Sequence, residues 1–116
     1  MFYKMGLDQR VTLYKNDGST ESEFWTWRKH PDLEGWMSRL FYEKGGEGEF
    51  NCKLVELEKD DILRLQIDIE NNNLPYTTGF FFGESDGSEK EDDLDFCRNA
   101  LEELEKGNRL TYHSWW

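Results

Sequence analysis

EFWTWRKHPDLEGWMSRLFYEKGG, residues 23–46, contains a change in the spacing of its apolar residues at a single proline. The spacing is two positions before Pro31 and three or four positions after it. Around Trp25 and Trp27, aromatic and polar residues alternate, as they do in a strand. Pro31 suits the first turn of a helix, because the backbone N–H that proline lacks would have no partner there. Beyond Pro31 the apolar residues form one helical stripe, which ends at Gly45–Gly46. A strand followed by an amphipathic helix favours an α+β domain.

The rest of the chain continues with segments of the same two kinds. A strand at Val11–Tyr14, closed by the turn Asn16–Gly18, is predicted to pair with Glu23–Arg28 as a hairpin. Further strands are predicted at Phe50–Leu57, Gly79–Gly83 and Arg109–Trp115, and further helices at Glu58–Glu70 and Asp92–Lys106. Residues 1–116 are therefore expected to form a single α+β domain of order ββαβαβαβ, in which three helices pack on a mostly antiparallel sheet of about five strands.

Apolar residues at helical spacing predict which faces of the two later helices are buried. For the helix at 58–70 these residues are Ile62, Leu63, Leu65 and Ile69. For the helix at 92–106 they are Leu94, Cys97, Leu101 and Leu104.

The chain is acidic, and its charge is unevenly distributed. It has 25 acidic and 14 basic residues and a net charge of −11, of which residues 84–105 contribute −8. Such a surface repels phosphate backbones, which argues against direct nucleic-acid binding, and it attracts basic protein surfaces. The residues expected to meet a basic protein are Glu84, Asp86, Glu89, Glu91, Asp92, Asp93 and Asp95. The alternative is a solvated helix face preceded by an acidic loop.

Cysteine and histidine usage favours neither a disulfide framework nor a metal site. Cys52 and Cys97 are far apart and are expected to be free thiols in a reducing compartment. Together with His30 and His113 they include no closely spaced pair of zinc ligands, so neither a metal nor a cofactor is expected. No apolar run approaches the roughly 18–20 residues of a membrane span, and the N-terminus lacks a signal-peptide pattern. We expect a cytoplasmic protein that does not bind membranes.

Cationic residues beside tryptophans give the best candidate ligand site. Arginine offers a planar set of donors for phosphates and stacks on aromatic rings, and the N-terminus of a helix adds a favourable dipole for an anion. The candidate ligand-binding residues are Trp27, Arg28, Lys29, His30, Trp36 and Tyr112. The alternative is that these rings belong to the core.

No sequence motif identifies a catalytic residue. His113 and Ser114 are neighbours in a predicted strand and so point to opposite faces, which prevents them from acting as a nucleophile–base pair. His30 or His113 could act as an acid or a base only in an arrangement that spacing does not reveal.

Three motifs resemble those of small, largely uncharacterised proteins encoded by tailed bacteriophages. They are WRKH at 27–30 with Gly35–Trp36, TGFFFG at 78–83 with Asp86, and YHSW at 112–115. The resemblance extends from about Phe24 to the C-terminus and implies a phage accessory protein without implying an activity.

Three functional hypotheses follow from the charge and the motifs. The first is a non-enzymatic phage accessory protein that binds a host protein with a basic surface and interferes with host physiology or defence. The second is a sponge that binds a small phosphorylated or nucleotide signal. The third is a small nucleotide hydrolase or transferase.

Overall fold

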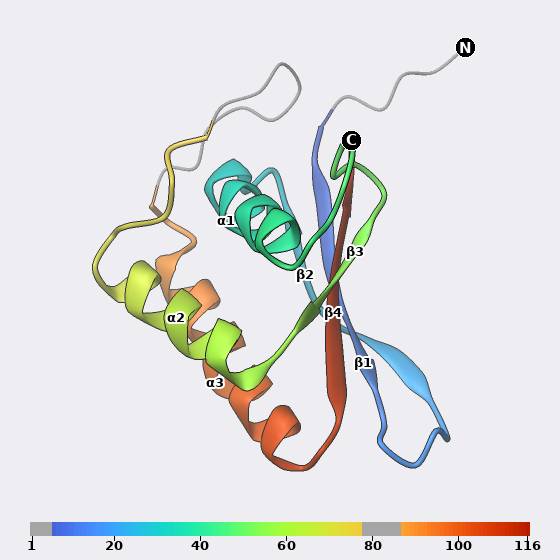
Figure 1. The fold of residues 1–116 in the computed structure, drawn as a ribbon. Coiled ribbons are helices and arrows are strands. Elements are labelled where there is room, and N and C mark those ends of the chain that lie inside the picture. Colours follow the sequence, from blue (N-terminus) through green and yellow to red (C-terminus); the bar gives the residue numbers. More distant parts are fainter. Residues whose placement is uncertain (1–5, 78–86) are drawn as a thin grey trace.

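The sheet and helices follow one another in the order ββαβααβ within residues 6–77 and 87–116, which the computed structural model describes. The strands and helices are β1 (Asp8–Tyr14), β2 (Glu21–Arg28), α1 (Pro31–Glu43), β3 (Leu54–Leu57), α2 (Lys59–Glu70), α3 (Lys90–Glu105) and β4 (Arg109–Trp115). Figure 1 shows that the three helices lie together on one side of the sheet, with α2 and α3 beside each other.

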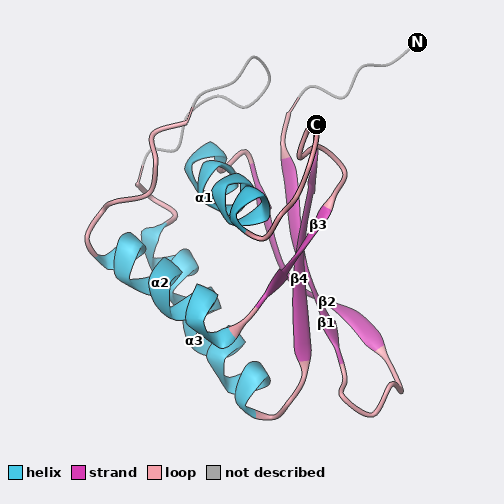
Figure 2. Ribbon diagram, in the orientation of Figure 1, coloured by secondary structure: helices cyan, strands magenta, loops and turns pink. Residues whose placement is uncertain are grey.

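All strand pairs are antiparallel, in the order β2-β1-β4-β3 (Figure 2). The central strands β1 and β4 are adjacent although almost the whole chain separates them, and Asp8 pairs with Trp115. None of the described helices covers the second face of the sheet (Figure 2). We call this second face the open face; its residues on the central strands are Asp8, Arg10, Thr12 and Tyr14 of β1 and Arg109, Thr111, His113 and Trp115 of β4.

The core lies between the helices and the covered face of the sheet. Strand alternation directs Val11 and Tyr112 inward, and both are fully buried. Phe96 of α3 is also fully buried, and its ring centroid lies 4.9 Å from that of Trp27, at an edge-to-face angle of 79°. Such aromatic pairs stabilise a core beyond their buried area. The bulky rings of β2 therefore hold α3 against the sheet.

The α+β class, the antiparallel sheet and the three helices are confirmed, whereas the strand count and order differ from the prediction. The described residues form four strands, and the predicted strand at 79–83 lies outside them. The predicted order ββαβαβαβ is thus replaced by ββαβααβ.

Two strand boundaries also differ from the prediction. β3 begins at Leu54 and not at Phe50, because residues 51–52 form a turn in which Cys52 has a φ of 63°. β1 begins three residues earlier than predicted, at Asp8. Cys52 is exposed and Cys97 buried, and neither is in a disulfide.

Gly35 allows residues 75–77 to pack closely on α1. A Cβ at this position would lie 2.1 Å from Oγ1 of Thr77, whose hydroxyl donates to the Pro75 carbonyl at 2.8 Å and whose N–H donates to Asp32 at 2.8 Å. We expect Gly35→Ala to lower the free energy of unfolding by about 1–2 kcal/mol, because the clash outweighs the gain in helix propensity. Urea unfolding measures this, with Ser38→Ala on the same helix as control. A Gly35→Ala variant at least as stable as the wild type would contradict it.

Candidate functional site

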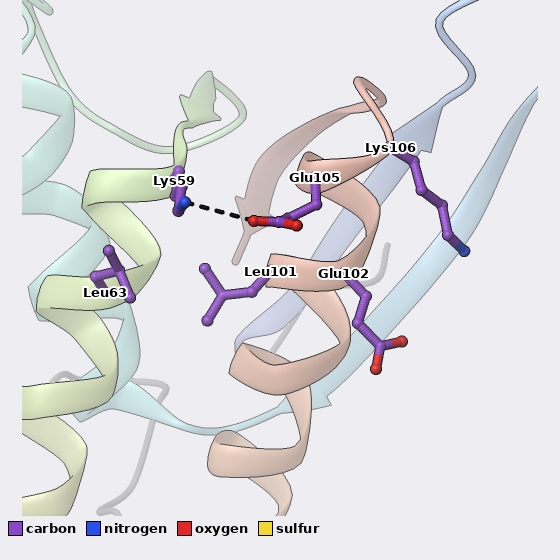
Figure 3. Close-up of a pocket in the computed structure, with 6 residues that line it drawn as sticks. All are labelled: Lys59, Leu63, Leu101, Glu102, Glu105 and Lys106. Atoms are coloured by element: carbon purple, nitrogen blue, oxygen red, sulfur yellow. Dashed lines mark hydrogen bonds and ion pairs between the residues drawn. The ribbon is translucent and has the colours of Figure 1, made fainter.

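The candidate site is a groove between α2 and α3 on the outer side of the helical layer. The two helices run antiparallel, since Lys59 at the start of α2 forms an ion pair with Glu105 at the end of α3 at 3.5 Å, and Lys90 reaches the Glu70 carbonyl at 3.3 Å. Between them lies a cavity of about 560 Å³. We call it the α2–α3 groove; it is lined by Lys59, Leu63, Leu101, Glu102, Glu105 and Lys106 (Figure 3).

Aliphatic side chains form the middle of the α2–α3 groove. In Figure 3 Leu101 of α3 points toward α2, and Leu63 lies on the facing side of the cavity. Leu63 is 38% exposed, and Ile67, one helical turn further along α2, is 57% exposed. A helix that already buries Ile62 and Leu65 in the core does not need these two residues for packing. They are therefore available for contact with another molecule.

Charged residues border this apolar centre, two lysines and two glutamates, and both helices are acidic overall. α3 carries seven acids and two bases, and α2 four acids and two bases, so the pair holds −7 of the net charge of −11. Glu102 and Glu105 are exposed at the groove itself. The Lys59–Glu105 ion pair spans one end of the groove (Figure 3) and joins two exposed side chains, so it is weak and easily replaced by an interaction with a partner.

Of the seven predicted protein-binding residues, none that the structure describes lines the α2–α3 groove. Glu91 and Asp92 are exposed, Asp95 is half-buried and paired with Arg98, and Glu89 is half-buried beside His30. Glu84 and Asp86 lie outside the described residues.

Asp93 is buried and holds two residues of the predicted ligand site. Its side chain accepts a hydrogen bond from Nε1 of Trp27 at 2.8 Å through one oxygen and contacts Nε2 of His30 at 2.7 Å through the other. His30 is itself 3% exposed, and its Nδ1 lies 3.9 Å from Glu89. Since Asp93 is 2% exposed, it cannot contribute to an acidic surface.

Gln9 of β1 links this group to a second buried group around Tyr112. Its amide accepts from the backbone N–H of His30 at 3.0 Å and donates to the Tyr112 hydroxyl at 2.9 Å. Tyr112 donates to Glu34 at 2.7 Å, and Ser114 donates to the other carboxylate oxygen at 2.9 Å. Burial raises the pKa of Glu34 to about 7, although both hydrogen bonds act in the opposite direction. The network makes its hydrogen bonds within the protein, so it needs no ligand to satisfy it.

The other predicted ligand-site residues lie apart from this network. Trp36 is buried and donates to Asp68 of α2 at 2.8 Å. Lys29 is exposed in the turn before α1, with a φ of 58°. The Arg28 side chain is 75% exposed on the open face and lies 3.8 Å from Asp8. The structure therefore brings Trp27, His30 and Tyr112 together inside the core, and it leaves the cations outside.

The two histidines differ in accessibility, and His113 borders a hollow on the open face. The His30 ring is enclosed, with Nε2 against Asp93. His113 is half-buried on the open face, 5.1 Å from the Trp115 ring, and its pKa is lowered by burial and by the charge of Arg10. Ser114 faces the helices, as strand alternation predicts.

The described residues form neither a cluster of metal-binding side chains nor a membrane-spanning helix. Residues 6–77 and 87–116 contain no group of three or more His, Cys, Asp or Glu side chains that could hold a metal ion. No helix in those ranges is both long and apolar enough to cross a bilayer.

Sequence reasoning missed the α2–α3 groove because its leucines have the spacing of core residues. Leu63 is predicted to be buried with Ile62 but is exposed, and Leu101 is only half-buried. One feature of the sequence does indicate the groove. Leu63 and Ile67 are four residues apart and therefore neighbours on the helix surface, on a different face from Ile62, Leu65 and Ile69. An aliphatic pair outside the main stripe indicates a second contact surface.

Comparison of the chain with protein-family models, with curated proteins and with solved structures found no match. The geometry of the site is therefore the basis for proposing a function.

Proposed function

We propose that this chain is a non-enzymatic accessory protein, of the kind encoded by tailed bacteriophages, which binds a basic host protein through the α2–α3 groove. The observation that carries the proposal is a cavity of about 560 Å³ with Leu63 and Leu101 in its lining, between two helices whose net charge is −7. Ile67, one turn further along α2, is also exposed. In this proposal the protein acts in the host cytoplasm and inhibits a host process or a defence system.

The shape and charge of the groove favour a basic amphipathic helix as the partner segment. A groove between two antiparallel helices accepts a third helix through an apolar residue that enters between the ridges. Leu63 and Leu101 would contact that residue, while lysines or arginines on either side of it would meet Glu102 and Glu105. The acidic surface would also speed the encounter with a basic protein.

The same arrangement argues against the hydrolase or transferase alternative. Catalysis needs an acid, a base or a nucleophile that reaches a substrate. The α2–α3 groove is lined by lysine, leucine and glutamate side chains, and among the described residues its lining includes no histidine, cysteine, serine or threonine. Binding is the activity that these residues support.

Reversing the charge of the groove is expected to weaken partner binding roughly 10- to 100-fold. The test variant is Glu102→Lys with Glu105→Lys, and the matched control is Glu21→Lys with Glu23→Lys on β2, which changes the net charge equally. The control should weaken binding by no more than about 3-fold, since its site is distant and exposed charges are screened by salt. Wild-type protein first isolates the partner from a bacterial lysate, and calorimetry with the purified partner then compares the variants.

Two outcomes would contradict this proposal. Equal losses in both double variants would mean that only the overall charge attracts the partner. Unchanged affinity in the groove variant, with the fold intact by thermal melting, would place the interface elsewhere. An Ile67→Ser variant adds a test of the apolar part, with an expected loss of roughly 10-fold.

A further inference from the structure

The open face of the sheet carries a second hollow, which is separate from the α2–α3 groove. It has a volume of about 290 Å³ and is lined by Asp8, Arg10, Thr26, Arg28 and Trp115, among others. We call it the Arg10 hollow. None of the residues that line it also lines the α2–α3 groove.

Strand register explains why these side chains meet. Arg10 pairs with Thr26 on one side and with His113 on the other, while Asp8 pairs with Arg28 and Trp115. Positions two apart on a strand share a face, so Arg28 and Trp115 are both diagonal neighbours of Arg10. The guanidinium of Arg10 accordingly lies 5.2 Å from the centroid of a Trp115 ring, within the range of a cation–π interaction.

Arg10 Nε makes no hydrogen bond within the described residues, although it is in an ion pair. Its Nε is the single buried side-chain nitrogen or oxygen, among residues 6–77 and 87–116, that has no hydrogen-bond partner. Glu23 is 3.4 Å away and forms an ion pair with it, but without hydrogen-bond geometry. Because Nε is buried beside Glu23 while the side chain as a whole is 43% exposed, an anion in the hollow would be bound by the terminal nitrogens of the guanidinium.

We propose that the Arg10 hollow binds a small aromatic anion of the class of a nucleoside monophosphate. The base would pack against the Arg10 guanidinium and the Trp115 ring, which contact each other. The phosphate would lie between Arg10 and the exposed Arg28. Guanidinium groups bind phosphate through paired donors and also stack on aromatic planes. Nothing in the proposed protein-binding function requires this site.

Size and charge restrict the ligand to a single nucleotide. A volume of about 290 Å³ is at the lower limit for ligand sites, which excludes larger dinucleotides. The neighbouring hollow beyond Arg10 is lined by Glu21 and Glu23, so a longer strand of phosphates would be repelled there. The net charge of −11 opposes polyanions in general.

Isothermal titration calorimetry tests the proposal with the adenosine, guanosine, cytidine and uridine monophosphates. At least one should bind, and the matching nucleoside and orthophosphate alone should each bind at least about 10-fold more weakly, because each lacks half of the contacts. No binding by any of the four at millimolar concentration would overturn the proposal. Equal binding of orthophosphate would overturn its aromatic part.

Two arginines on the open face provide a matched pair of variants. Arg10→Ala should weaken nucleotide binding roughly 10- to 100-fold, whereas Arg109→Ala, which removes a guanidinium bound to Glu56, should change it by less than about 3-fold. If Arg10→Ala fails to fold, Arg10→Lys keeps the charge but loses the planar donors, and it should still bind about 10-fold more weakly. Equal losses in the Arg10 and Arg109 variants would overturn the site. The Glu102→Lys/Glu105→Lys protein should bind nucleotide as the wild type does, which separates this proposal from the α2–α3 groove.

Discussion

Asp93→Ala is expected to lower the free energy of unfolding by about 3–5 kcal/mol, because it removes the acceptor for two buried donors. Trp27 Nε1 lies 2.8 Å and His30 Nε2 2.7 Å from the Asp93 oxygens, and all three side chains are less than a tenth exposed. Each unsatisfied buried donor costs about 1–3 kcal/mol, and a small cavity adds to this. Urea unfolding followed by tryptophan fluorescence measures the change.

Asp92 provides the control for this experiment. It is the adjacent residue in the first turn of α3, so its loss removes the same favourable interaction with the helix dipole. It is exposed and accepts a hydrogen bond from Nε1 of Trp25 at 3.1 Å. Asp92→Ala should therefore cost no more than about 1 kcal/mol. Equal costs for Asp92→Ala and Asp93→Ala would show that the buried network contributes little.

The burial of Asp93 also affects how charge-reversal variants of α3 are interpreted. A lysine at position 93 would place an unpaired charge in the core, so loss of partner binding would follow from unfolding and not from a lost contact. The acids suited to a binding experiment are the exposed ones, of which Glu102 and Glu105 line the α2–α3 groove.

Asp93→Asn offers an intermediate case, since it keeps an acceptor for Trp27, and a cost of about 1–2 kcal/mol is expected.

Local pattern was enough to predict much of this fold. The change of spacing at Pro31 predicts both β2 and α1, because strand and helix periods are set by the backbone alone. The turn Asn16–Gly18 predicts the hairpin of β1 and β2 for the same reason. By contrast, the pairing of β1 with β4 joins residues about a hundred positions apart, and no local period encodes it.

Site residues were harder to predict because residue type alone does not reveal which groups surround a side chain. Asp93 resembles its acidic neighbours, yet it shares a helical line with buried Phe96, Cys97 and Ala100, and that spacing indicates a core position. Glu34 likewise lies one turn from Met37 on the buried side of α1. Which donors they meet depends on β1 and β4, so the network itself could not be derived from spacing.

Glu34→Gln is expected to make the protein more stable at alkaline pH and to remove most of the pH dependence that this residue causes. Burial raises the pKa of Glu34 from 4.5 to about 7 in the folded protein, so the folded state binds the proton more tightly than the unfolded chain. The stability from this protonation is fully present below about pH 4.5 and is lost as the pH rises through about 7. The difference between the pKa of Glu34 in the folded protein and in the unfolded chain corresponds to roughly 3 kcal/mol of stability.

Glutamine is a suitable replacement because it matches the protonated carboxyl group. Its carbonyl can accept from Tyr112, and its amide can donate to the Ser114 hydroxyl, which now donates to Glu34. The difference in unfolding free energy between Glu34→Gln and wild type should therefore rise by up to about 3 kcal/mol between about pH 5 and pH 8. Glu49→Gln, on an exposed loop, should show no such rise. Urea unfolding of the three proteins at both pH values measures this. A constant difference for Glu34→Gln would mean that the buried carboxylate keeps its ordinary pKa, because water or a structural change stabilises its charge.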